Sequence, residues 1–175
     1  MKKDAERLDP LRPGQWPPEL DEILQSLGNP LNIHGIMAHH TALTLAWMPF
    51  RNHIVANSSL EPRHRELLIL RTAVNCNATY EWEHHVVRGR EAGLSHDEIQ
   101  RVKDGPGAAQ WSSADRLLLL AADECHRESV ISDTTLHDLC LVFNERQQLD
   151  IIATVGMYMT LAVIIRTYKV PLEKN

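Results

Sequence analysis

The sequence contains few cysteines and few aromatic residues. Its three cysteines, Cys76, Cys125 and Cys140, are far apart and odd in number, and no C-x-x-C pair occurs. This usage is typical of a reducing compartment, where thiols serve as small core residues rather than as disulfide partners. Aromatic residues make up 5% of the chain, and alternating runs of Val, Ile and Thr are scarce. The sequence therefore predicts helices rather than sheets.

Concentrated positive charge is missing as well. The 18 Lys and Arg residues are outnumbered by 23 Asp and Glu residues, the net charge is −5, and no basic cluster is longer than a pair. Proteins bind nucleic acid and anionic membranes through concentrated basic surfaces. The composition thus argues against both as partners.

Long apolar runs are also lacking. The longest, Ile151 to Ile165, is bounded by Asp150 and Arg166 and is shorter than the ~20 residues that span a bilayer. We interpret it as a buried or interface helix. Residues 1–7 are mostly polar and contain no apolar stretch of the kind found in signal peptides, so a cytoplasmic protein is expected.

What is present fits one compact helical domain. The chain has 175 residues, and 43% of them are apolar, which is enough for a core. Residues 1–18 are rich in proline and are expected to form an extended arm, and residues 19–175 a single domain. Apolar periodicity and the turn and cap signals predict an all-α protein, an irregular bundle of seven to eight helices. One of these helices is expected to break near Pro49.

A glutamate lies on a strongly apolar predicted helix, residues 63–76. Glu66 shares a helical face with Ile69, Leu70 and Ala73, so this helix should be buried. Burial is costly for an unpaired carboxylate and raises its pKa, which would make Glu66 a proton-transfer residue. Pairing with a nearby arginine at a helix seam is the alternative.

A carboxylate and an imidazole are one helical turn apart in the next predicted helix, residues 80–92. Glu81 and His85 are spaced i, i+4 and project from one face. A carboxylate bonded to one ring nitrogen sets the tautomer and raises the basicity of the other nitrogen. The first-turn position of Glu81 favours its ionised form. A solvated ion pair at the same spacing is the alternative.

Together these residues have the spacing of a known family. The segment from Glu66 through Ala78 and Glu81 to His85 resembles the carboxymuconolactone decarboxylase family of the alkylhydroperoxidase D-like superfamily. In the peroxidase branch of that superfamily, a Glu is followed by C-x-x-C and then His. Ala78 and Glu81 stand at the two cysteine positions here, and the sequence from Tyr80 to His85 is similar to that of the decarboxylase-type branch.

The resemblance implies an alkylhydroperoxidase D-like homo-oligomer, a trimer or hexamer, and a lyase of aromatic compound catabolism that requires no cofactor. The implied reaction is loss of CO2 from a small carboxylated or lactone-type substrate such as 4-carboxymuconolactone. His85 is then expected to act as acid or electrophile, Glu81 to orient and charge it, and Glu66 to be the buried proton partner. Tyr80 and His53 are candidate substrate-binding residues.

Other functions stay open at this point. One is a peroxidase-type oxidoreductase without the usual cysteine pair, and another is a non-catalytic helical oligomer that binds a small molecule. Two E-x-x-H motifs, Glu61–His64 and Glu81–His84, would suit a metal site in a helix bundle. The first lies at a helix start next to proline and is poorly placed to face inward, so no metal is expected. Cys76 has no partner cysteine nearby, which argues against two-cysteine peroxidase chemistry.

Overall fold

The structure is a computed structural model and describes residues 7–173, so the first six residues of the predicted arm lie outside it. Within that range it contains nine α-helices and no strand, and the predicted all-helical class is confirmed. The α-helices are α1 (Asp21–Leu27), α2 (Asn32–Met37), α3 (Thr41–Asn52), α4 (Pro62–Asn75), α5 (Thr79–Glu91), α6 (His96–Arg101), α7 (Ser113–Glu128), α8 (Asp133–Val142) and α9 (Glu145–Tyr168). The short turns are η1 (Pro13–Gln15), η2 (Pro18–Leu20), the π-helical η3 (His53–Asn57) and η4 (Val102–Asp104).

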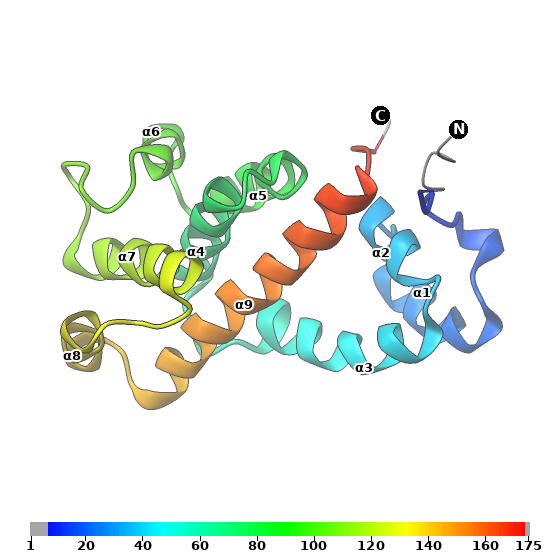
Figure 1. The fold of residues 1–175 in the computed structure, drawn as a ribbon, viewed down its shortest axis with the longest axis horizontal. Helices are drawn as coiled ribbons and strands as arrows, with labels where there is room; N and C mark the ends of the chain where they lie inside the picture. The colour runs from blue at the N-terminus through cyan, green and yellow to red at the C-terminus, as the bar shows by residue number, and fades with distance from the viewer. Residues whose placement is uncertain (1–6, 174–175) are drawn as a thin grey trace, which may run out of the picture.

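Helix α4 lies at the centre of the main core. Its residues 66–70 are all buried, and it packs against α5, α7 and α9. Full burial of each leucine or isoleucine in this run stabilises the fold by ~1.5–3 kcal/mol. Figure 1 shows α9 crossing the molecule diagonally, with α4 to α8 on one side and α1 to α3 on the other.

Residues 7–20 pack against the N-terminal helices. The amide of Leu11 donates to the carbonyl of Gly35 in α2 at 3.2 Å. A Cβ on Gly35 would lie 2.5 Å from the carbonyl oxygen of Leu11, so only glycine allows this close approach. Trp16 and Leu20 are buried in a cluster with Ala38. This layer holds α1, α2 and the start of α3 together.

The helix break expected near Pro49 lies elsewhere, at residues 38–40 between α2 and α3. The side chain of His40 caps α3 by accepting a hydrogen bond from the amide of Leu43 at 3.2 Å. Histidine is not among the usual capping residues, so no capping signal marks the start of α3 in the sequence. Pro49 lies inside α3, and the neighbouring Phe50 is 39% exposed, so no packed layer opposes the local distortion that proline causes.

Helix α9 is long and apolar enough, by length and composition, to cross a membrane. In this fold 44% of its most apolar window is buried, and the helix packs against α4, α7 and η3. The core helix of a soluble protein has the same features. The placement agrees with the interpretation of this segment as a buried or interface helix.

Candidate active site

Three ionisable side chains meet between α4 and α5. Glu66 comes from α4, and Glu81 and His85 come from successive turns of α5. Their exposed fractions are only 3%, 5% and 2%. The helices pack closely at Gly89 of α5, where an added Cβ would lie only 3.3 Å from a methyl carbon of Leu70 in α4. The structure thus brings together the three residues that the spacing singled out.

His85 is held in one tautomer and one orientation. Its Nδ1 lies 2.6 Å from Oε2 of Glu66, and its Nε2 lies 3.3 Å from Nη1 of Arg88. A guanidinium only donates, so Nε2 accepts and Nδ1 carries the ring proton, which it donates to Glu66. Tyr158 of α9 packs edge-on against the imidazole, with ring centroids 5.0 Å apart.

Burial and this hydrogen bond set the charges of the pair. Complete enclosure lowers the pKa of His85, and the bond to Glu66 offsets only part of that effect. Burial alone would raise the pKa of Glu66, but the bond from His85 and the nearby Arg65, whose Nε is 3.5 Å from Oε1, lower it overall. The pair is a neutral imidazole donating to a carboxylate. The expectation of a raised pKa for Glu66 is wrong, because His85 supplies a donor.

Glu81 lies on the other side of the ring. Its Oε2 is 3.6 Å from Nε2 of His85, too far for a hydrogen bond. Burial raises the pKa of Glu81 to about 7, and the positive charge of Arg88 opposes this only in part. A large fraction of Glu81 is therefore a neutral acid near pH 7. Two expectations are corrected: the helix N-terminus does not keep Glu81 ionised, and Glu66 rather than Glu81 orients the imidazole.

Glu81 and His85 border an internal cavity between α5, α9 and the N-terminal helices α1 to α3. It contains about 680 Å³ of empty space, and this figure includes open solvent at its mouth. Most of its walls are apolar. The apolar lining includes Leu31, Ile33, Met37, Trp47, Met157 and Leu161.

Positive and donor groups also border this cavity. Arg51 of α3 and Arg88 of α5 are among its lining residues, and within residues 7–173 neither forms an ion pair with a carboxylate. Nδ1 of His34 accepts from the amide of Leu31 at 2.9 Å, so its Nε2 carries the proton. Burial lowers the pKa of His34 to about 4, which keeps it neutral. The cavity wall thus offers two cations and one neutral N–H donor.

A second cavity reaches His85 from another side. Arg65, Glu66, Arg88 and Glu91 are among the residues that border it, and it is more polar than the first. His85 and Arg88 border both cavities. Glu66 therefore has access to solvent protons by a route that does not pass through the apolar cavity.

Tyr80 borders the apolar cavity, but its hydroxyl is already bonded. The hydroxyl donates to Oε1 of Glu173 at 2.6 Å and accepts from the amide of Ile33 at 3.4 Å. Burial and the bond to Glu173 raise the pKa of Tyr80, so it stays neutral. The one proton of its hydroxyl is therefore already donated to Glu173.

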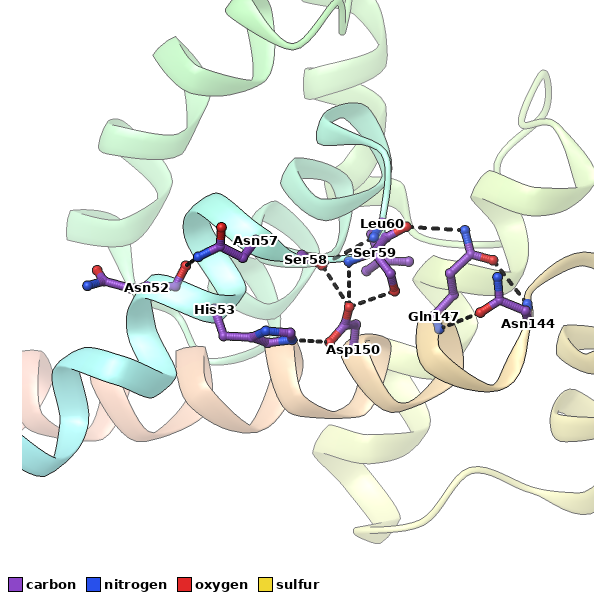
Figure 2. A network of polar contacts seen from close by, with 9 residues as sticks. All are labelled: Asn52, His53, Asn57, Ser58, Ser59, Leu60, Asn144, Gln147 and Asp150. Atoms are coloured by element: carbon purple, nitrogen blue, oxygen red, sulfur yellow. Dashed lines mark hydrogen bonds and ion pairs between the residues drawn. The ribbon is translucent and has the colours of Figure 1, made fainter.

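His53 does not border either cavity. Figure 2 shows its ring turned toward Asp150 of α9, and Nε2 donates to Oδ1 of Asp150 at 2.6 Å. Oδ2 of the same carboxylate accepts from the amide and the hydroxyl of Ser59 at 2.6 and 2.7 Å. The side chain of His53 is 50% exposed. The geometry gives no support to the expected role of His53 in substrate binding, because the ring instead ties η3 to α9.

The cysteine expected to be a packing residue lies outside the cavities. Cys76 is buried in a cluster with Ala73, Ala78 and Ala162, and its Sγ lies 3.7 Å from Nδ1 of His126. Burial raises the pKa of its thiol, which keeps it protonated and weakly nucleophilic. In the part of the chain that the structure describes, no group of three His, Cys, Asp or Glu residues is arranged to hold a metal ion.

Several residues of the site were not predicted from the sequence. His34, Arg51 and Tyr158 come from three different helices, so no spacing along one helix relates them to His85. Arg88 is the exception, because it follows His85 by three residues and lies on the same face of α5. The i, i+3 spacing of His85 and Arg88 was the one feature of the sequence that could have identified Arg88 as a site residue.

The comparisons with known proteins agree with this geometry. The family model described as the carboxymuconolactone decarboxylase family matches residues 41–124, a range that contains the whole of α4 and α5. Over this segment the chain is similar to the family. No curated protein matches the sequence.

Solved structures share the fold of this chain at low sequence identity. A cysteine-to-alanine variant of the debrominase Bmp8 in complex with 2,3,4-tribromopyrrole is 15% identical, with a TM-score of 0.79 over 98% of this chain and 94% of that one. An uncharacterized peroxidase-related protein from Silicibacter sp. TM1040 is 18% identical, with a TM-score of 0.79 over 99% and 95%. Another from Ralstonia eutropha JMP134 is 15% identical, with a TM-score of 0.78 over 97% and 95%. At such identities the likeness supports an alkylhydroperoxidase D-like fold and no particular activity.

Proposed function

We propose that the protein is a carboxy-lyase that removes CO2 from a small, largely apolar substrate with a carboxylate near a carbonyl or lactone group. The observation that carries this proposal is the buried arrangement of Glu66, His85 and Glu81 beside an apolar cavity, with Glu81 poised to titrate near neutral pH. Similarity to the carboxymuconolactone decarboxylase family over residues 41–124 supports the same chemistry.

The cavity wall suits an anion with an apolar body. The substrate ring contacts the apolar side chains, and Arg51, Arg88 and Nε2–H of His34 bind its oxygen atoms. Apolar surroundings solvate a carboxylate poorly, which favours its departure as neutral CO2. The electron pair of the broken C–C bond moves into the adjacent carbonyl, and an arginine beside that oxygen stabilises the dienolate.

Glu81 supplies the proton that completes the reaction. In its neutral form it protonates the carbon that lost CO2 and is left as a carboxylate, so the carboxylate substrate and one proton yield CO2 and the protonated product. His85 stays neutral, because its one ring proton is on Nδ1 and bonds to Glu66, and its Nε2 lies 3.6 Å from Glu81. Solvent then returns a proton to the site. Glu81 is therefore the acid, and the His85–Glu66 pair lies beside it.

The related debrominase was solved with a small flat bromopyrrole, and the apolar walls of this cavity would also accept a flat ring. A peroxidase-type reaction by the cysteine route would need a thiol at the cavity. Cys76 instead packs beside His126 with its pKa raised. Proton transfer therefore fits the site better than thiol redox chemistry.

The test is CO2 release from 4-carboxymuconolactone by the wild-type protein and by Glu81→Gln and His85→Ala. Loss of a general acid or of its partner should lower kcat/KM about 10²- to 10⁴-fold. Wild-type kcat/KM should fall as the pH rises through about 7, because Glu81 loses its proton there. Glu83→Gln, on the exposed face of α5, is the control and should keep full activity. Full activity in both site variants would contradict the roles proposed for Glu81 and His85. No CO2 release by the wild type would contradict the proposed carboxy-lyase function.

A further inference from the structure

The residues after α9 lie against one wall of the apolar cavity. Val170 is buried in a cluster with Ile33 and Tyr80, both of which border the cavity. The carbonyl of Pro171 accepts from the side-chain amide of Asn32 at 2.9 Å. Residues 169–173 therefore run from the end of α9 to the start of α2, which lie close together in Figure 1.

The carboxylate of Glu173 joins three groups at this wall. Its Oε1 accepts from the backbone amide of Asn32 at 2.7 Å and from the hydroxyl of Tyr80 at 2.6 Å. Its Oε2 lies 2.8 Å from Nε2 of His84, an ion-pair distance without the alignment of a hydrogen bond. Burial alone would raise the pKa of Glu173, but the two hydrogen bonds lower it overall. Glu173 is thus a charged acceptor at neutral pH.

Each of the three contacts joins Glu173 to an element of the site. Asn32 is the first residue of α2, where helical amides have no partner within the helix. Tyr80 and His84 are on α5, directly before Glu81 and His85, and their rings are 4.6 Å apart between centroids. One side chain therefore links α2 to the turn of α5 that carries Glu81.

We propose that Glu173 is a positioning residue of the active site. Its carboxylate fixes α2 against the first turns of α5 and so sets where Tyr80 and His84 meet a ligand in the cavity. The bonds at the start of α2 do not depend on any reaction. The effect on turnover rests on the proposed carboxy-lyase function.

Amide hydrogen exchange of the ligand-free protein tests the structural part. Glu173→Ala should accelerate exchange in residues 32–37 and 79–85 about tenfold, because local opening of both segments becomes easier, while α7 keeps its protection. Glu83→Gln, which changes an exposed glutamate of α5, should exchange like the wild type. Unchanged exchange of residues 32–37 in Glu173→Ala would overturn the proposal.

Turnover of 4-carboxymuconolactone tests positioning separately from stability. Glu173→Ala should lower kcat/KM about tenfold with little change in Tm, and Glu173→Gln, which retains Oε1 as an acceptor, should recover part of the loss. If Glu173→Ala had the same kcat/KM as the wild type, the proposal would also be overturned. If the wild type releases no CO2, the carboxy-lyase proposal alone fails, and the exchange experiment still decides the role of Glu173.

Discussion

The protonation of Glu81 connects the chemistry of the cavity to the stability of the fold. The folded protein raises the pKa of this carboxyl from 4.5 to about 7, mainly by burial. The native state therefore binds a proton more tightly than the unfolded chain. The contribution of Glu81 to stability is most favourable below about pH 4.5 and is lost as the pH rises to about 7.

Glu81→Gln should remove this pH dependence, because the amide has nearly the same shape and no charge. The free energy of unfolding of the variant, minus that of the wild type, should rise between pH 5 and 7.5, by at most ~1.4 kcal/mol per unit of the pKa difference. Urea unfolding followed by circular dichroism at several pH values measures this difference. Glu83→Gln should show none. A flat difference for Glu81→Gln would mean that Glu81 is ionised in the native protein throughout this range.

At the scale of elements, one carboxylate holds α9 to the segment between α3 and α4. Asp150 is 6% exposed and accepts from His53, from Ser58 and from both the amide and the hydroxyl of Ser59 (Figure 2). Burial alone would raise the pKa of Asp150, but these bonds lower it overall. The carboxylate thus stabilises the fold at neutral pH, and this contribution is lost as the pH falls through its lowered pKa.

Asp150→Asn should lower the free energy of unfolding by about 2–4 kcal/mol, because an amide group cannot accept all of these hydrogen bonds. Thermal and urea unfolding at pH 7 measure the loss. His53→Ala is the matched variant: its half-exposed ring forms one of the bonds, so we expect a cost of about 1 kcal/mol or less and unchanged turnover. A large loss of kcat/KM in His53→Ala would restore the substrate-binding role expected from the sequence.

The elements that the sequence predicted best are those with local signals. The observed ends of α4 (Pro62–Asn75) and α5 (Thr79–Glu91) differ by one residue from the predicted helices 63–76 and 80–92. The predicted break near Pro49 was wrong because Pro49 lies inside α3, and the break at residues 38–40 was missed because capping by His40 has no usual sequence signature. Local sequence signals therefore located most of the helices, but a helix start with an unusual capping residue was missed.

The site shows the same division. Spacing within α5 related Glu81 to His85, but the carboxylate that bonds to His85 is Glu66 on another helix, nineteen residues earlier. Glu173 contacts Tyr80 from a position 93 residues later. The family spacing grouped Glu66 with His85, but it did not say which atoms meet, and no signal related Glu173 to Tyr80, because the packing of distant helices creates these bonds. The site residues were predictable as candidates, and their bonds and charges were not.

At the scale of the whole molecule, α9 exposes an apolar stripe on the side away from the core. Its members are Leu149, Ile152, Gly156, Thr160 and Val163, which follow one another at intervals of three or four residues and are all exposed. Leu149, Ile152 and Val163 are 69%, 48% and 65% exposed, and a Cβ on Gly156 would meet no atom within 4 Å. This spacing and the small central residues suit close packing of two helices.

We propose that this stripe packs against a second copy of the chain, as part of the homo-oligomer that the family resemblance implies. A stripe of this length without charged residues is unfavourable in water and is typical of a subunit interface. Sedimentation at micromolar concentration should give an oligomer for the wild type, and Ile152→Glu should shift it toward the monomer by burying an unpaired charge. Val87→Glu, on an exposed position of α5 outside the stripe, should keep the wild-type mass. A monomeric wild type, or an Ile152→Glu variant of unchanged mass, would show that α9 does not form the interface.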